Sequence, residues 1–198
     1  MSWVIVGLGN PGAEYDNTRH NAGRMALEHF AKKNDLRDWK EDKKNELTVA
    51  KGAIGKHIFV LLLPETYMNK SGSAVLKYVK GPKAAEKMLV VYDDLDLPIG
   101  KIKLSYDRGS GGHKGLDSIM RAVKTRKFAR IRIGVCPEAA SGAMKKPQGE
   151  EAVNKFILGK FNALETEELK KVFKRVNDAI TATVERGPMI AMNEFNRN

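Results

Sequence analysis

The sequence predicts an α/β fold, in which residues 1–198 form a single domain and a mixed β-sheet has helices on both faces. Short apolar runs rich in β-branched residues alternate with stretches of helical periodicity along most of the 198-residue chain, and this alternation is typical of an open α/β sheet. The turn Gly52-Ala53-Ile54-Gly55 separates two such runs and predicts a hairpin, which makes the sheet mixed. The length fits one domain, since roughly 100–200 residues form a typical unit.

The first elements are a strand, a long loop and a helix. Trp3–Gly7 is short, β-branched and ends in glycine, as expected of a buried strand. Residues 8–20 show no apolar periodicity, and loops of this length in compact domains are usually functional. Asn21 is a good N-cap for a helix that runs to about Lys33, with apolar residues at i, i+3 and i+4 spacing.

A hairpin and a short helix follow. The hairpin strands are expected at residues 46–51 and 56–63, and the continuous apolar run at 58–63 indicates a strand that is covered on both faces. Pro64 ends this strand, and a helix is expected at about 70–79.

The second half continues the alternation. Strands are expected at 88–92, 99–105 and 129–135, and a helix at 115–123. Residues 137–149 are rich in Gly, Pro, Ser and Ala and predict a mobile surface loop.

The last helix has clear boundary signals. Asn162 and Glu165 have the spacing of a capping box, with Asn in place of the usual Ser or Thr. Apolar residues recur along one face up to Val184, and Gly187-Pro188 ends the helix.

The charge composition indicates an anionic partner. The chain has 35 Lys and Arg against 24 Asp and Glu, a net charge of +11. Residues 101–132 hold ten cations and only two anions, which favours nucleic acid, whose phosphates Lys and Arg contact. A solvated cationic face is the alternative. The ten cations are Lys101, Lys103, Arg108, Lys114, Arg121, Lys124, Arg126, Lys127, Arg130 and Arg132.

The cysteine content and the hydropathy of the chain limit where in the cell it is expected. Cys136 is the sole cysteine, so an intrachain disulfide and a four-cysteine zinc site are excluded, and a reducing, cytoplasmic location is expected. No apolar run approaches the roughly 20 residues that cross a bilayer, and the N-terminus shows no basic leader, so we expect no membrane association.

The first glycine-rich motif resembles a nucleotide site but has the wrong context. Residues 7–12, Gly-Leu-Gly-Asn-Pro-Gly, match the G-x-G-x-x-G pattern of dinucleotide-binding folds. In that motif the third glycine lies at the start of the helix that holds the pyrophosphate. Helical periodicity here begins only near Asn21, so we expect these glycines to shape a turn.

His20 and a group of aspartates each follow a predicted strand. Loops at the carboxyl ends of strands meet in the functional crevice of an open α/β sheet. A carboxylate on one imidazole nitrogen fixes the tautomer, so that the other nitrogen can take a proton from water. The candidate partners are Asp93, Asp94 and Asp96. Alternatives for these aspartates are a solvated turn before Pro98 or a divalent-ion site, although no clustered histidine supports a transition metal.

A second glycine-rich loop, Gly-Ser-Gly-Gly-His-Lys-Gly at 109–115, opens the helix at 115–123. Backbone N–H groups at a helix N-terminus suit an anion or a carbonyl oxygen, and a flexible connector is the alternative. A Ser-His-Asp triad has less support, because no serine lies in a G-x-S-x-G turn.

Several motifs, taken in this order, resemble those of the bacterial-type peptidyl-tRNA hydrolases. The matching stretches span about residues 3–161. They are V-G-L-G-N-P-G at 6–12 with Tyr15, T-R-H-N-A-G at 18–23, P-E-T-Y-M-N-K-S-G at 64–72, D-D-L-D-L-P at 93–98 with Gly100, G-S-G-G-H-K-G-L at 109–116, R-I-R-I-G-V at 130–135 and F-I-L-G-K-F at 156–161.

The resemblance implies a monomeric three-layer α/β/α domain with a twisted mixed sheet. Members of this family cleave the ester between a peptide and the 3′ ribose of tRNA and so recycle tRNA from aborted translation. The resemblance therefore implies tRNA as the partner and a reaction without a metal or cofactor.

The resemblance also implies roles for single residues. His20 would be the general base that activates water, and Asp93 would orient it. Asn10 and Asn69 would position the peptide and the attacked ester. Three further side chains would line the crevice: Tyr15, Met68 and His113.

Two departures from the family pattern affect substrate contacts. Lys114 stands where the family's G-G-H-N-G loop has Asn, so a donor-only cation replaces an amide. A basic residue that some members place late in the strand at 99–105 falls near Ser105 here, so Arg132 and Lys103 are assigned to the tRNA 5′ phosphate. Because of Lys114, a non-catalytic module that binds tRNA or rRNA is the alternative function.

Overall fold

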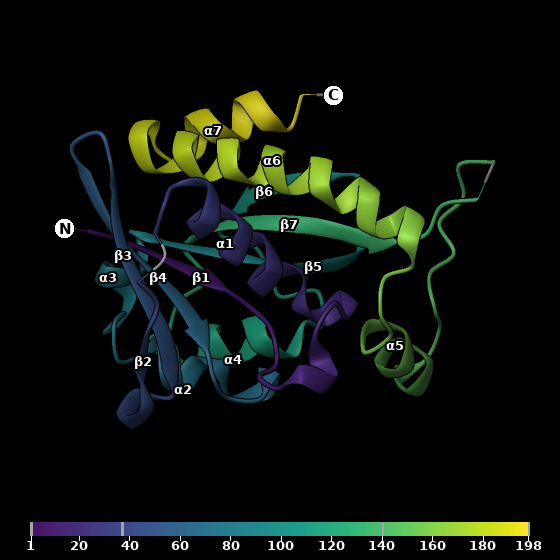
Figure 1. Cartoon of the computed structure of the whole chain (residues 1–198), viewed down its shortest axis with the longest axis horizontal. Helices are drawn as coiled ribbons and strands as arrows, with labels where there is room; N and C mark the ends of the chain where they lie inside the picture. The colour runs from purple at the N-terminus through teal and green to yellow at the C-terminus, as the bar shows by residue number, and fades with distance from the viewer. Residues whose placement is uncertain (1, 37, 140, 198) are drawn as a thin grey trace.

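The computed structural model describes residues 2–36, 38–139 and 141–197, and its described residues form a seven-stranded mixed sheet (Figure 1). The strand order is β2-β3-β4-β1-β5-β7-β6. The central strands β4, β1, β5 and β7 run parallel, whereas the pairs β2–β3, β3–β4 and β6–β7 are antiparallel. The strands are β1 (Trp3–Gly7), β2 (Lys40–Asp42), β3 (Leu47–Ile54), β4 (His57–Pro64), β5 (Met88–Pro98), β6 (Ile102–Tyr106) and β7 (Ala129–Cys136).

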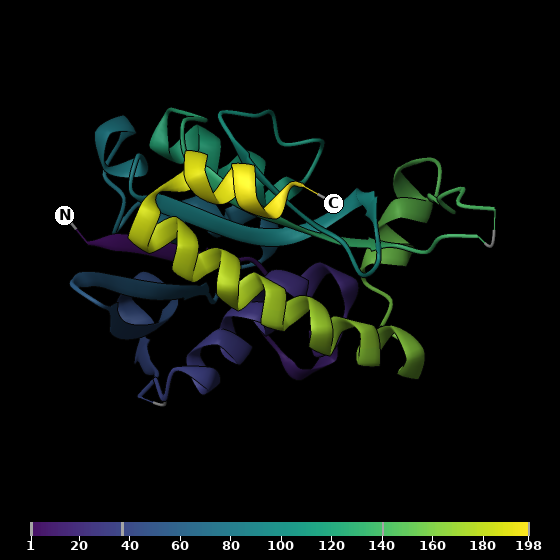
Figure 2. The ribbon, with the colours of Figure 1, turned by 90° about the horizontal axis from the view of Figure 1, so that it is seen from above.

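Helices cover both faces of the sheet, so the predicted α/β/α arrangement is confirmed (Figures 1 and 2). Helices α1, α6 and α7 lie on one face and α2, α3 and α4 on the other, while α5 lies beyond one end of the sheet. The helices are α1 (Ala22–Lys33), α2 (Ser71–Val75), α3 (Pro82–Ala85), α4 (Lys114–Val123), α5 (Glu150–Ile157), α6 (Ala163–Arg186) and α7 (Pro188–Phe195).

The sheet separates two hydrophobic cores. Successive side chains of a strand point to opposite faces, so Ile5 of β1 packs in the core under α1 and α6, and Val6 packs in the core under α2 and α4. Both residues have no exposed surface. The continuous apolar run predicted for β4 is explained in the same way, because this strand is covered on both faces.

Several boundaries differ from the predicted ones. The helix expected at about 70–79 is a 3₁₀ turn, η4 (Met68–Lys70), followed by the short α2. Strand β5 does not end at Tyr92 but continues through the aspartates to Pro98, because its extension pairs with β7. The long loop after β1 contains two 3₁₀ turns, η1 (Ala13–Tyr15) and η2 (Arg19–Asn21). The first α-helix after the glycine motif at 7–12 begins only at Ala22, as predicted.

The chain after β7 contains helices that the sequence analysis did not predict. The described part of the segment 137–149 is mostly exposed and forms a turn, in which the Ala139 N–H donates to the Ala143 carbonyl oxygen at 2.8 Å. Ala140, within the predicted loop, lies outside the described residues. Helix α5 follows at once. The predicted capping box of α6 is present, and Gly187 ends that helix, but Pro188 then starts α7, where a missing N–H has no cost.

The parallel strands place four loops at one edge of the sheet. The carboxyl ends of β1, β4, β5 and β7 lie at this edge, and the loops after β1 and β4 and the end of β5 bring together the residues considered below. Gly23 lets α1 approach closely there, since a Cβ atom at this position would lie 2.2 Å from the Val91 carbonyl oxygen. No helix among the described residues is long and apolar enough to span a membrane.

Candidate active site

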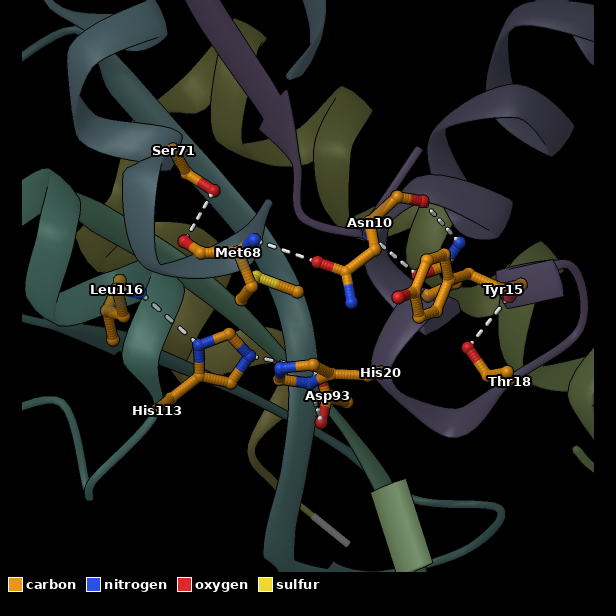
Figure 3. A network of polar contacts seen from close by, with 10 residues as sticks. Asn10, Tyr15, Thr18, His20, Met68, Ser71, Asp93, His113 and Leu116 are labelled. Carbon is orange, nitrogen blue, oxygen red and sulfur yellow. Dashed lines mark hydrogen bonds and ion pairs between the residues drawn. The ribbon is translucent and has the colours of Figure 1, made fainter. Parts of the chain in front are cut away.

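His20 and Asp93 form the centre of the site. His20 lies in η2, before α1, and Asp93 lies in β5. The His20 Nδ1 atom is 3.0 Å from Asp93 Oδ1 and 3.1 Å from Oδ2, and the two residues are 5% and 3% exposed (Figure 3). The structure thus joins two residues that are 73 positions apart in the sequence, as the resemblance implied.

A second histidine contacts the same carboxylate. His113 Nε2 is 3.0 Å from Asp93 Oδ1, and the centres of the two imidazole rings are 4.9 Å apart. His113 is also the N-cap of α4, and its Nδ1 accepts a hydrogen bond from the Leu116 N–H at 3.3 Å. The expectation that no histidines cluster here was wrong.

The hydrogen-bond network assigns the tautomers. Because Nδ1 of His113 accepts from a backbone N–H, the proton of the neutral ring lies on Nε2 and is donated to Asp93. Asp93 is a carboxylate and only accepts, so His20 donates to it through Nδ1. The Nε2 atom of His20 is then unprotonated and has no hydrogen-bond partner within the described chain, as a general base requires.

The electrostatics of Asp93 keep it ionised. Burial by itself raises the pKa of this carboxyl, but the neighbouring His20 and His113 rings together lower it by more, so the pKa of Asp93 lies well below its ordinary value of 3.8. Asp93 therefore carries its negative charge throughout the physiological pH range, where it can stabilise an imidazolium on His20.

Asn10 is held in one orientation by its neighbours. Its Oδ1 accepts from the Met68 N–H at 2.8 Å, so its Nδ2 is left to donate, and Figure 3 shows this nitrogen pointing to the side of the crevice where His20 lies. Asn21 binds the backbone of Asn10 through both side-chain atoms: its Oδ1 accepts from the Asn10 N–H at 2.8 Å and its Nδ2 donates to the Asn10 carbonyl at 3.0 Å. Asn21 occupies the N-cap position of α1, as predicted, but its side chain makes this bridge and no cap bond.

The other residues implied by the resemblance lie around this centre or at its rim. Tyr15 is half-buried beside Asn10, and Met68 is buried. Asn69 is exposed in the middle of the same turn that carries Met68. Lys114 is also exposed, and its Nζ atom lies 3.1 Å from Glu150 Oε1 of α5.

A cavity of about 240 Å³ is lined in part by His20, Asp93 and His113, but not by Asn10 or Met68. Its walls are the glycine loop 109–112, the end of β5 and helix α5, which contributes Val153 and Ile157. Four cationic side chains reach it: Arg108, Lys114, Arg132 and Lys146. Helix α5 was not predicted from the sequence as a wall of the site.

Two of the ten cations of residues 101–132 are buried and paired, so the alternative of a solvated cationic face does not hold for these two. Arg130 has no exposed surface, and its Nη1 donates to the Gly109 carbonyl at 2.8 Å, so it anchors the glycine loop. Arg132 is 4% exposed and its Nε donates to Asp94 Oδ2 at 2.5 Å. Lys103 is exposed and lies opposite Arg132 in the β6–β7 register.

The aspartates after Asp93 do not form a solvated turn. They belong to β5, where Asp94 pairs with Arg132 and Asp96 pairs with Lys146. The remaining alternative is a metal site, and two imidazoles with one carboxylate form a donor set that a transition metal accepts. In this structure the ring nitrogens that face Asp93 are hydrogen-bonded to that carboxylate themselves.

The sequence of this chain is similar to a known protein family over nearly its whole length. Residues 4–198 match the family model described as peptidyl-tRNA hydrolase. The peptidyl-tRNA hydrolase of Herpetosiphon aurantiacus is 40% identical over 98% of this chain and 90% of its own length, and that of Aquifex aeolicus is 37% identical over 98% and 96%.

The fold agrees with solved structures of proteins with the same name. The crystal structure of peptidyl-tRNA hydrolase from Acinetobacter baumannii superposes with a TM-score of 0.86 at 35% identity, covering 99% of this chain and 95% of that one. A complex of peptidyl-tRNA hydrolase with N-propanol gives the same TM-score at 36% identity. With the family model and these relatives matching over nearly the whole length, the chain belongs to the peptidyl-tRNA hydrolase family of enzymes, which hydrolyse peptidyl-tRNA.

Proposed function

We propose that this chain hydrolyses the ester between a peptide and the 3′ ribose of tRNA, with His20 as the general base. The observation that carries the proposal is the buried His20–Asp93 pair, in which Asp93 holds Nδ1 and leaves Nε2 free to accept a proton. A general base in this arrangement contributes roughly 10²–10⁴-fold to a rate.

The reaction proceeds by attack of water on the ester carbonyl. His20 Nε2 takes a proton from the water as its oxygen bonds to the carbonyl carbon, and the charge of Asp93 stabilises the resulting imidazolium. The ester C–O bond then breaks, and the proton passes from Nε2 to the 3′ oxygen of the ribose. The products are a peptide with a free carboxyl group and a tRNA with a free 3′ hydroxyl.

Amide groups stabilise the charge that develops on the carbonyl oxygen. Asn10 suits this role because Met68 and Asn21 hold it so that Nδ2 is the atom left to donate. Asn69 lies on the turn beside Met68 and contributes a second amide. Removing one such donor costs roughly 10²–10³-fold in other enzymes. Tyr15, Met68 and His113 line the crevice.

The tRNA phosphates are bound by Lys103 and Arg132. Lys103 is exposed and lies next to Arg132 across the β6–β7 pair, so the two can contact one phosphate group if Arg132 exchanges Asp94 for it. Such contacts fix the orientation of the nucleic acid and make its binding depend on salt. In this proposal the chain acts in the cytoplasm as a monomer with one catalytic domain, without a metal or cofactor.

The experiment is release of N-acetyl amino acid from N-acetyl-aminoacyl-tRNA by purified protein in the presence of EDTA. We expect full activity in EDTA and at least about 10²-fold loss in His20→Ala, because the base is missing. The matched control is His57→Ala, a histidine at the amino end of β4, whereas the site lies at the carboxyl ends of the parallel strands. Near-normal turnover by His20→Ala contradicts the proposal. Loss of activity in EDTA that zinc restores assigns the His20–Asp93–His113 group to a metal instead.

A further inference from the structure

Arg19 precedes His20 in η2, yet its side chain lies among residues that belong to a distant part of the chain. His20 contacts Asp93, whereas the Arg19 guanidinium contacts the segment Phe156–Glu165, which contains the end of α5 and the start of α6. Its side chain is 11% exposed, although arginine is almost never buried unless it is paired.

The contacts of Arg19 fix this segment in several ways. Nη2 donates to both carboxylate oxygens of Glu165, at 3.0 and 2.8 Å, and Nη1 donates to the Lys160 carbonyl at 3.0 Å. The guanidinium carbon lies 4.4 Å from the centre of the Phe156 ring and 5.3 Å from that of Phe161, within the range of cation–π attraction.

The backbones on either side are joined as well. The Arg19 N–H donates to the Gly159 carbonyl at 3.1 Å, and the Phe161 N–H donates to the Asn17 carbonyl at 3.0 Å. The turn that carries His20 is therefore attached to the α5–α6 connection through the backbone and through one buried charge.

Glu165 accepts hydrogen bonds both from Arg19 and from the start of its own helix, α6. Besides accepting from Arg19, its Oε2 accepts from the Asn162 N–H at 2.8 Å in the capping box of α6. The Arg19–Glu165 pair thus ties the start of a 24-residue helix to the residue beside His20. A buried pair of this kind costs desolvation, and its loss leaves an uncompensated buried charge.

We propose that Arg19 is a positioning residue for the hydrolysis, which holds His20 against Asp93 and at the same time holds α5 as a wall of the cavity. His20 must keep Nδ1 at 3.0 to 3.1 Å from the Asp93 oxygens, and hydrogen bonds weaken steeply when they lengthen or tilt. Phe156, which stacks on Arg19, neighbours Ile157, which lines the cavity. The inference rests on the proposed role of His20.

The test compares Arg19→Met and Arg19→Lys with Glu165→Gln. The matched control, Lys171→Met, breaks the exposed Lys171–Glu168 pair on the same helix α6. For each variant, circular dichroism verifies the fold, and kcat and KM are measured on N-acetyl-aminoacyl-tRNA between pH 5 and 9.

For Arg19→Met we expect kcat to fall roughly 10- to 100-fold with KM within about threefold, because a misplaced base costs up to about 10²-fold. The acid limb of the kcat profile moves to lower pH, since a displaced imidazolium loses the Asp93 charge. Arg19→Lys recovers part of kcat, because it keeps the charge but not the planar set of donors. Glu165→Gln gives a smaller loss in the same direction, and Lys171→Met gives none.

A folded Arg19→Met variant that keeps kcat within threefold and the same acid limb overturns the proposal. If Arg19→Met does not fold, Arg19→Lys and Glu165→Gln decide: an unchanged kcat and acid limb in both is the contrary result. The result that would contradict the proposed role of His20 can be told apart from these outcomes, because His20→Ala would then retain activity. If His20→Ala is inactive while the Arg19 variants are normal, only the role of Arg19 is wrong.

Discussion

Among the single residues, Asp93 has the most demanding position, because it is buried and accepts hydrogen bonds from two histidines. One carboxylate therefore fixes the tautomer of His20 and also connects it to the start of α4, where His113 is the N-cap. In the proposed function, the charge of Asp93 therefore contributes to both catalysis and folding.

Asp93→Asn replaces this charge with a neutral amide of the same shape. We expect kcat to fall at least about 10²-fold, since the imidazolium that forms in the reaction loses its anion. The acid limb of the kcat profile moves to lower pH for the same reason. Initial rates across pH 5 to 9 measure both effects, and an unchanged profile removes Asp93 from the mechanism.

The same charge makes the stability depend on pH. Because the pKa of Asp93 is lower in the folded state than its ordinary value of 3.8, its contribution is fully present above that value and is lost as the pH falls toward the folded-state pKa. We expect the free energy of unfolding to fall more steeply below about pH 4 in the wild type than in Asp93→Asn. Urea unfolding at pH 3 to 6 measures the two slopes, and parallel slopes contradict the account.

The contacts of some single residues could be predicted from the sequence, and those of others could not. The prediction that His20 and Asp93 meet at this edge of the sheet is confirmed, although Asp93 lies within β5 and not after its end. An Asn side chain can cap a helix or bind backbone groups elsewhere in the chain. At Asn21 only the tertiary structure decides which of these contacts forms. Arg130 and Arg132 count as surface charge in a sequence, although their partners Gly109 and Asp94 lie elsewhere in the chain.

Among the elements, the close contact of α1 with β5 determines where the loop before α1 delivers His20. Gly23 makes this contact possible. In Gly23→Ala the new methyl group would meet the backbone oxygen of Val91 at 2.2 Å, and backbone cannot move aside cheaply. We expect destabilisation by about 1–3 kcal/mol, or a fall in Tm of roughly 2–12 °C. Gly109→Ala is the matched control, with nothing within 4 Å of the new atom, and equal Tm values for the two variants are the contrary result.

Helices α4 and α5 are joined at the rim of the cavity by Lys114, which contacts Glu150 and Asn154. The Lys114 and Glu150 side chains are 52% and 80% exposed, so the pair contributes little to stability. We expect Lys114→Asn to leave Tm unchanged and to lower KM, because an amide can both donate to and accept from a peptide and no ion pair must be broken. A higher KM shows that the cation itself binds substrate.

The helices and strands that have local sequence signals were predicted, and those that depend on distant pairing were not. Periodicity identified β1, β4, α1 and α6, and the capping box placed the start of α6 correctly. The extension of β5 was missed because its pairing with β7 involves residues about 40 positions away. Helix α5 was missed because it follows directly on a segment rich in Gly, Pro and Ser.

In the whole molecule, the cationic side chains behind the net charge of +11 are spread along the chain, and some of them are buried. Arg130 and Arg132 are buried, and Arg126 pairs with Asp107, so residues 101–132 present fewer free cations than their composition suggests. In the proposed function, attraction of tRNA depends on exposed residues such as Lys103, while burial shields the His20–Asp93 pair from salt.

Salt therefore affects capture of the substrate more than its cleavage. With two phosphate contacts, we expect KM to rise roughly tenfold between 50 and 200 mM salt while kcat changes little. Lys103→Met reduces the slope of log KM against log salt by about one, whereas the exposed Lys51→Met on β3 leaves it unchanged. A fall in kcat as steep as the rise in KM contradicts this separation.

The measurement that tests the central claim most directly is the single-turnover rate of His20→Ala, Asp93→Asn and the double variant, at saturating enzyme with N-acetyl-aminoacyl-tRNA. If Asp93 acts through His20, Asp93→Asn slows the wild type at least about 10²-fold but slows His20→Ala by less than about threefold. If Asp93→Asn slows both backgrounds by the same factor, the two residues act independently, and the account of His20 as a base held by Asp93 is wrong.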